Sequence, residues 1–194
     1  MTLSTFLLGA LLAVAEPTSA AAPSPAPAQC VTDREALMAL NIHAFDQDLN
    51  GGWRPIAARE ECVDEAADLI RDYRKFVTSR TLILYWHEGQ LRAQLGETEA
   101  AIALFDKSRR EPADDEYGWN HYVDAAIAFL RRNRSALEAA RGRLANAKVP
   151  DFPADWSGSR GPMNLDVVDG LLRCFGRSYK EAYSAEECRP PAPR

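Results

Sequence analysis

The sequence lacks an excess of positive charge and has no long apolar run after its N-terminus. Its 194 residues carry 23 lysines and arginines against 28 aspartates and glutamates, a formal net charge of -5. Nucleic-acid-binding proteins generally need a basic face that neutralises phosphates, so nucleic acid is not an expected partner. Beyond residues 6–15, no apolar run approaches the length that spans a bilayer, so no membrane span is expected in the mature chain.

The common catalytic and metal-binding signatures are also missing. The sequence has no G-x-S-x-G motif, P-loop, dinucleotide fingerprint or C-x-x-C pair. His87 and Glu88 begin like the zinc motif H-E-x-x-H, but Leu91 stands where the second histidine is needed. Residues 46–51 match the opening of a calcium loop, yet its twelfth position is Ala57 rather than an acid, and a simple turn is the favoured interpretation. No metal or cofactor is therefore expected.

The N-terminus has the pattern of a secretory signal peptide. The apolar run FLLGALLAVA, residues 6–15, has the length of a signal-peptide core and is followed by small residues. Cleavage is expected after Ala20 or Ala28, although the first five residues supply no lysine or arginine. An N-terminal anchor or a disordered leader is the alternative. We expect residues 1–28 to be a signal peptide and Ala/Pro-rich leader, and the protein to be exported: periplasmic in a Gram-negative bacterium, secreted otherwise.

Four cysteines remain after cleavage at either position: Cys30, Cys62, Cys174 and Cys188. An even number in an exported chain favours two disulfides over a metal site. Proximity along the chain suggests the pairs Cys30–Cys62 and Cys174–Cys188. The first pair has a geometric difficulty, because one cysteine precedes a predicted helix and the other opens the next, which places them at opposite ends of a hairpin. The loop or the leader would have to fold back, so the connectivity stays open.

Helical periodicity runs through the body of the chain, and no segment has convincing strand periodicity. A capping box of Thr32 and Glu35 predicts a first helix that continues to about Asp48. Apolar residues at i, i+3, i+4 and i+7 spacing predict a second helix from Val63 to Tyr73. Further helices are expected over residues 81–95, 98–109, 116–130 and 135–147. Residues 29–150 are thus predicted to form three αα-hairpins.

These hairpins repeat along the sequence. In the second helices, Ala66, Ala101 and Ala136 are each 35 residues apart, as are Ile70, Phe105 and Ala140. In the first helices, His87 and His121 lie 34 apart, whereas His43 and His87 lie 44 apart. The irregular interval indicates an insertion of about nine residues in the first turn, over residues 52–61. A period of 34 to 35 residues in helix–turn–helix units is typical of a solenoid.

The central unit resembles a tetratricopeptide repeat. Tyr85, Gly89, Gly96, Ala101 and Phe105 stand where that family places an aromatic residue, two glycines, an alanine and a second aromatic residue. The third unit matches at Trp119 and Ala136, and the first at Gly52, Ala66 and Ile70. The sequence departs from the family at Glu88 and Arg92, which are four residues apart on one helix face and can pair.

Residues 151–188 differ from the repeats and are predicted to form a capping helix pair. Asn164 is expected to cap one helix, and a capping box of Ser178 and Glu181 predicts a second. A stack of repeats needs an end that covers its last hydrophobic face, which this pair would supply. The proline-rich residues 189–194 are expected to be a disordered tail.

The resemblance implies that the first helices line a concave groove that holds peptide ligands. The three histidines, the only ones in the chain, share one register of these helices. On that basis the expected ligand-binding residues are His43, Asp46, Trp86, His87, Gln90, Asn120, His121 and Asp124. Alternatively, each histidine only bonds its own neighbouring Asp or Gln on a solvated face.

The expected function is that of an exported, tetratricopeptide-like scaffold that binds a protein or peptide in a polar groove. One alternative is an enzyme of unknown class that uses the His/Asp pairs as general acid–base groups, although no nucleophile is evident. Another is a purely structural assembly subunit with an apolar convex face. The resemblance is to a fold, and a fold alone does not determine function.

Overall fold

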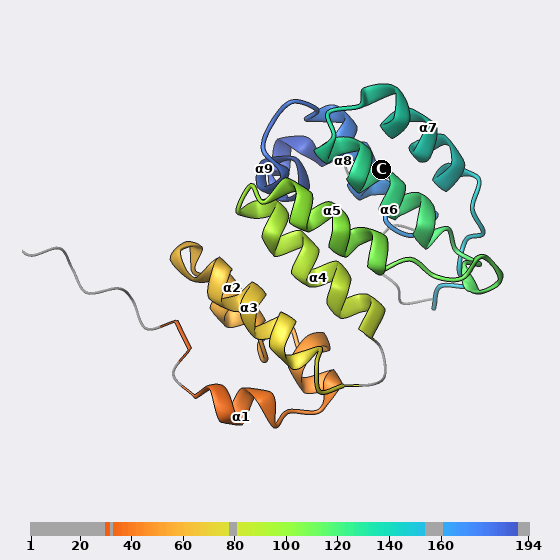
Figure 1. Ribbon diagram of the computed structural model, residues 1–194. Helices are drawn as coiled ribbons and strands as arrows, with labels where there is room; N and C mark the ends of the chain where they lie inside the picture. The colour runs from red at the N-terminus through yellow and green to blue at the C-terminus, as the bar shows by residue number, and fades with distance from the viewer. Residues whose placement is uncertain (1–29, 32, 78–80, 154–160, 190–194) are drawn as a thin grey trace, which may run out of the picture.

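The computed structural model describes residues 30–31, 33–77, 81–153 and 161–189 (Figure 1). Within this part of the chain the structure is helical with no strand, so the prediction of an all-α fold is confirmed. The predicted signal peptide and leader lie outside the described residues, as does all of the predicted tail except Arg189. None of the described helices is long and apolar enough to cross a membrane.

The helices are α1 (Arg34–Met38), α2 (Arg54–Ala57), α3 (Val63–Tyr73), α4 (Thr81–Gln94), α5 (Thr98–Lys107), α6 (Trp119–Leu130), α7 (Arg134–Ala145), α8 (Leu165–Arg173) and α9 (Tyr179–Ser184). Short 3₁₀ turns at Glu60–Cys62, Pro112–Asp114 and Glu186–Cys188 and a π-helical turn at His43–Gln47 complete the structure.

The first predicted helix is wrong in its extent, because it breaks after Met38. The predicted capping residue Thr32 lies outside the described residues, and Asp33 caps α1 by accepting a hydrogen bond from the main-chain N–H of Ala36 (2.9 Å). The carbonyl of Leu40 then accepts a hydrogen bond from the Tyr73 hydroxyl (2.6 Å). Asn41 caps the following turn through Ala44 N–H (3.0 Å). Two local caps and one long-range bond from Tyr73 thus replace the helical hydrogen bonds that a continuous helix would need.

The insertion in the first unit folds into α2 and the 3₁₀ turn that follows it. Gly52 opens this segment with a φ of +57°, and a Cβ at this position would lie 1.8 Å from the carbonyl oxygen of Phe45. Only glycine fits such a conformation next to a backbone carbonyl. The turn lets Trp53 and Ile56 enter the N-terminal core, where they are 6% and 7% exposed.

The insertion also resolves the geometric difficulty of the first disulfide. Because the chain turns back through α2, Cys62 comes to lie beside Cys30, with a Cα–Cα distance of 5.4 Å. Cys174 and Cys188 form the second disulfide, with a Cα–Cα distance of 5.6 Å. Both pairings suggested by sequence proximity are therefore present, and two disulfides are compatible with an exported protein.

Helix α4 is the central wall of the molecule, with α3 on one side and α5 on the other (Figure 1). Leu84 and Leu91 of α4 belong to an N-terminal core, whereas Trp86 and Ala93 belong to a C-terminal one. One helix thus contributes apolar side chains to two cores, which explains why its hydrophobic residues do not follow a single stripe.

Two helical hairpins are clear in the structure, α4 with α5 and α6 with α7. Gly89 of α4 faces α5 so closely that a Cβ would lie 2.7 Å from the Phe105 ring. The equivalent positions Ile70, Phe105 and Ala140 of the second helices are all fully buried. The first unit departs from this plan, because α3 packs mainly against α2 and α4.

Buried charge ties α3 to α4. Glu88 is 4% exposed and accepts hydrogen bonds from Arg74 Nε and Nη2 at 3.3 and 2.7 Å. Arg92 pairs instead with Asp68 and Glu97. The pairing between Glu88 and Arg92 that their spacing allowed is therefore absent, because each charge finds a partner on another element, which the sequence spacing does not show.

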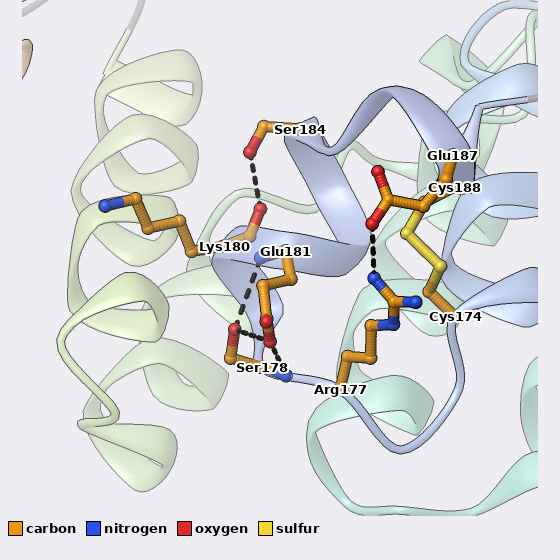
Figure 2. The surroundings of a disulfide bond; sticks show 8 residues. All are labelled: Cys174, Arg177, Ser178, Lys180, Glu181, Ser184, Glu187 and Cys188. Carbon is orange, nitrogen blue, oxygen red and sulfur yellow. Dashed lines mark hydrogen bonds and ion pairs between the residues drawn. A yellow bond between two sulfur atoms is a disulfide. The ribbon is translucent and has the colours of Figure 1, made fainter.

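The C-terminal helices cover the last hairpin and then reach back to the middle of the molecule. Helix α8 packs on α6 and α7, while α9 contacts α4. Figure 2 shows the predicted capping box of Ser178 and Glu181 at the start of α9, beside the disulfide that joins Cys174 to Cys188. Asn164 precedes α8 as predicted, but its side chain makes no capping hydrogen bond.

Candidate functional site

The most unusual polar group of the structure is the fully buried carboxylate of Asp46. It lies in the π-helical turn His43–Gln47 and accepts hydrogen bonds from His87 Nδ1 (2.6 Å), Trp53 Nε1 (3.0 Å) and the Gln47 side chain. Burial alone would raise the pKa of Asp46, but these bonds and the charge interaction with His87 hold that pKa below its usual value. The carboxylate is therefore ionised at neutral pH and acts only as an acceptor.

This carboxylate determines the state of the His87 ring. Because an ionised Asp46 can only accept, His87 must carry a hydrogen on Nδ1, which leaves Nε2 on the opposite side of the ring for other interactions. The His87 side chain is 12% exposed and its ring centroid lies 5.3 Å from that of Trp53. The arrangement is a histidine oriented by a buried acid, with one ring nitrogen available.

His87 lines a pocket of about 470 Å³ between α2, α4 and α9, which we call the His87 pocket. Gln90 and Gln94 follow His87 along α4, and Tyr183 of α9 closes the opposite side. The complete lining is Leu49, Trp53, Arg54, Ala57, Ala58, His87, Gln90, Leu91, Gln94 and Tyr183. A volume of this size is in the range of small-ligand pockets.

Residues next to the lining also bond to one another and hold the walls of the His87 pocket together. Lys180 of α9 pairs with Glu60 of the 3₁₀ turn after α2, with Nζ and Oε1 2.8 Å apart. The Tyr122 hydroxyl donates to the Tyr183 hydroxyl at 3.2 Å. The N-terminal insertion and the C-terminal helix therefore meet across α4, although Glu60 and Lys180 are 120 residues apart in the sequence.

The eight predicted binding residues do not form one groove. Asp46, His87 and Gln90 come together at the His87 pocket, whereas His43 is exposed outside its lining. Trp86 is 3% exposed and packs in the core against Phe105, Trp119 and Tyr122. The structure thus places Trp86 in the core instead of in a groove, because the next residue, His87, takes the position that faces the pocket.

The remaining three predicted residues lie near the third hairpin. The Asn120 side chain bonds the main chain of Arg110 in both directions, at 3.0 and 2.9 Å, and so braces the loop before α6. Asp124 pairs with Arg109 and Arg143 at 2.9 Å each. His121 Nδ1 lies 3.4 Å from Arg143 Nε and 4.0 Å from Asp124.

Asp124 borders a second cavity, of about 290 Å³, between α5, α6 and α7. This cavity shares no lining residue with the His87 pocket. The alternative, in which each histidine bonds only its own neighbouring residue, does not hold for Asp46, which bonds His87 rather than His43. His121 stays within 4.0 Å of Asp124, but Asp124 is bonded more closely by Arg109 and Arg143.

Several lining residues were missed by sequence reasoning. The hydrogen bond from Trp53 to Asp46 has no signal in the sequence, because the two residues meet only through the turn at Gly52. Arg54 and Tyr183 carry no sequence signal for a shared site, because one belongs to the insertion and the other to the C-terminal helix. Among the described residues, no group of three or more histidines, cysteines or acids is placed to hold a metal ion.

Comparison with known proteins does not assign a family to this chain. No family model matches it, and neither does any curated protein or solved structure.

Proposed function

We propose that this chain is an exported helical-repeat scaffold, similar to tetratricopeptide-repeat proteins, that binds a protein or peptide partner. The observation that supports the proposal most directly is the His87 pocket, which combines apolar walls with amide, imidazole and guanidinium groups. Pockets that bind ligands typically have such a mainly apolar lining with a few convergent polar groups. The close α4–α5 packing at Gly89 and Phe105 is consistent with the family resemblance.

The proposal narrows the binding site compared with the sequence prediction. It assigns binding to the His87 pocket alone, because His121 and Asp124 lie outside that pocket and contact Arg109 and Arg143 instead. Binding in this pocket would use residues of three elements that are distant in sequence. A partner would therefore recognise the folded protein and not one repeat.

A pocket-filling substitution tests the proposal. Ala58 is exposed at the rim of the pocket, so Ala58→Trp should block it without disturbing either core. The matched control is Ala139→Trp, which adds the same side chain on an exposed position of α7. Affinity capture from the exported fraction with mass spectrometry should recover a partner with wild type and the control but not with Ala58→Trp. Equal recovery by all three proteins would contradict binding in this pocket.

A second candidate function is an enzyme that uses His87 as a general base. The observation in its favour is the 2.6 Å contact between His87 Nδ1 and the buried carboxylate of Asp46, since this arrangement orients an imidazole for proton transfer. The described lining contains no serine, threonine or cysteine, so this candidate has His87 activate a water molecule as the nucleophile. Hydrolysis of p-nitrophenyl acetate at equal rates by wild type and His87→Gln would argue against this candidate.

A further inference from the structure

The described polar groups that line the His87 pocket include a positive charge and no negative one. Arg54 contributes a guanidinium, His87 an imidazole, Gln90 and Gln94 two amides, and Tyr183 a hydroxyl. None of the described residues in the lining carries a carboxylate, although the chain as a whole has a net charge of -5. The polar groups in the lining are thus neutral or positive, in a protein in which acidic side chains outnumber basic ones.

Resting on the binding function proposed above, we propose that the His87 pocket binds a peptide segment through an acidic side chain. The occupant is a short stretch of another polypeptide whose Asp or Glu carboxylate accepts hydrogen bonds from Arg54 and, when the ring is protonated, from His87 Nε2. The positive group comes from the insertion and the hydroxyl from α9, so neither belongs to the repeated helices.

Arg54 is held in place before any ligand arrives. Its Nε and Nη2 donate to the main-chain carbonyl of Asp46 at 3.2 and 2.8 Å, and its guanidinium carbon lies 4.4 Å from the centre of the Trp53 ring. Among the described residues no carboxylate forms a salt bridge with it, so its charge is unmatched. A guanidinium fixed in this way loses little side-chain entropy when it binds a carboxylate.

The negative charge of Asp46 does not oppose an anionic ligand strongly. That carboxylate is fully buried behind His87 and accepts from three donors, which offset its charge locally. On the far side of the pocket, the Tyr122 hydroxyl donates to Tyr183, so the Tyr183 hydroxyl keeps its own hydrogen for a ligand.

The rest of the lining suits a peptide better than a small free acid. Gln90 and Gln94 are four residues apart on one face of α4. Each amide can donate to and accept from the main chain of an extended segment. Leu91 and Trp53 supply apolar surface between these groups, and Leu49, which is 77% exposed, extends it to the rim.

Selection from a random peptide library displayed on phage tests the inference with the full exported chain. Peptides retained by wild type are counter-selected against Ala58→Trp, so that only those that need the open pocket remain. We expect these peptides to share an Asp or Glu. A fluorescein-labelled version of one such peptide should bind about tenfold or more tightly than its Gln counterpart in anisotropy titrations, because hydrogen bonds to charged groups are the stronger ones.

Two variants test whether the acidic side chain of the peptide binds at Arg54 inside the pocket. Arg54→Gln should remove most of the preference for the acidic peptide over its Gln counterpart. Because Arg54 also bonds the Asp46 backbone, Gln94→Glu provides a second test that leaves those bonds intact, and its added charge should weaken the acidic peptide selectively. Ser135→Glu, which adds the same charge on exposed α7, is the control and should leave binding unchanged.

The outcomes separate this inference from the proposed function. Pocket-dependent peptides without acidic residues would overturn the inference while the binding function stands. If no retained peptide depends on the open pocket, the binding function fails as well. Sodium glutarate at matched ionic strength serves as a competitor of the labelled peptide. If glutarate displaces the labelled peptide at concentrations as low as those at which the unlabelled peptide does, the ligand is a small dicarboxylic acid and the peptide assignment is wrong.

Discussion

A comparison of two glycine-to-alanine substitutions provides a sensitive test of the packing at the centre of this protein. Gly89 lies within α4 and Gly142 within α7, so both substitutions add one methyl group to a helix. Alanine is favoured over glycine in a helix interior by about 1 kcal/mol. At Gly142 nothing lies within 4 Å of the added carbon, and Gly142→Ala should therefore stabilise the protein by about 0.5–1 kcal/mol.

At Gly89 the same methyl group meets an obstacle. It would lie 2.7 and 2.8 Å from two ring carbons of Phe105, well inside the usual contact distance of about 3.5–4.0 Å. The ring has little room to move, since Phe105 is fully buried and its centroid lies 4.4 Å from that of Trp86. Overpacking of this kind costs about 1–3 kcal/mol, which offsets the gain in helix propensity or exceeds it.

The difference between the two variants isolates the packing strain, because the propensity gain is common to both. We expect Gly89→Ala to be less stable than Gly142→Ala by about 1–3 kcal/mol, measured by urea unfolding followed by far-UV circular dichroism and tryptophan fluorescence. For a chain of this size, a difference of 2 kcal/mol corresponds to about 4–8 °C in Tm. Equal stabilisation by the two substitutions would refute the close approach of α4 and α5.

Three further predictions concern the buried carboxylate, the C-terminal disulfide and acid stability. Asp46→Asn should lower the free energy of urea unfolding by about 2–4 kcal/mol, because it removes a buried charge on which three donors converge; a loss below about 0.5 kcal/mol would contradict that network. Replacement of Cys174 and Cys188 by serine should cost about 3 kcal/mol, as expected for a closed loop of about 15 residues, and unchanged Tm in a thermal scan would show that the bridge is dispensable. Hydrogen bonding to Lys75, against some desolvation, lowers the pKa of Asp72 from 3.8 to about 2. The ionised Asp72 therefore stabilises the fold above pH 4, and this stabilisation is lost as the pH falls to 2. In urea unfolding, Asp72→Asn should be less stable than wild type by about 1 kcal/mol at pH 5 after solvent screening, and a difference that persists near pH 2 would contradict the shift.

Local sequence signals account for much of the helical framework. The capping box at Ser178 and Glu181 forms as predicted, and the residues Ile70, Phe105 and Ala140, which repeat every 35 residues, are all buried. Such signals are reliable because they involve residues a few positions apart, or a pattern that recurs whenever one helix face is buried. The break after Met38 was missed, since it depends on Tyr73, 33 residues beyond the Leu40 carbonyl that it bonds.

The candidate site was less accessible to sequence reasoning. The shared register of the histidines pointed to His87, which lines the pocket, but it placed Asp46 beside His43 and included Trp86, which is buried in the core. A register shows which positions face the same way on repeated helices. It does not show how an insertion bends the chain, and here the bend carries Asp46, Trp53 and Arg54 to one side of α4.

The sequence by itself determined that this protein is built from helices and where most of them lie, and it suggested the two cysteine pairs without deciding between the possible connectivities. These properties depend on local propensity, apolar periodicity and short loops. Only the tertiary structure decided that the N-terminal insertion and the C-terminal α9 meet across α4 and enclose the His87 pocket. That arrangement depends on contacts between residues as distant as Glu60 and Lys180, and the free energy that favours it is spread over packing that no local pattern encodes.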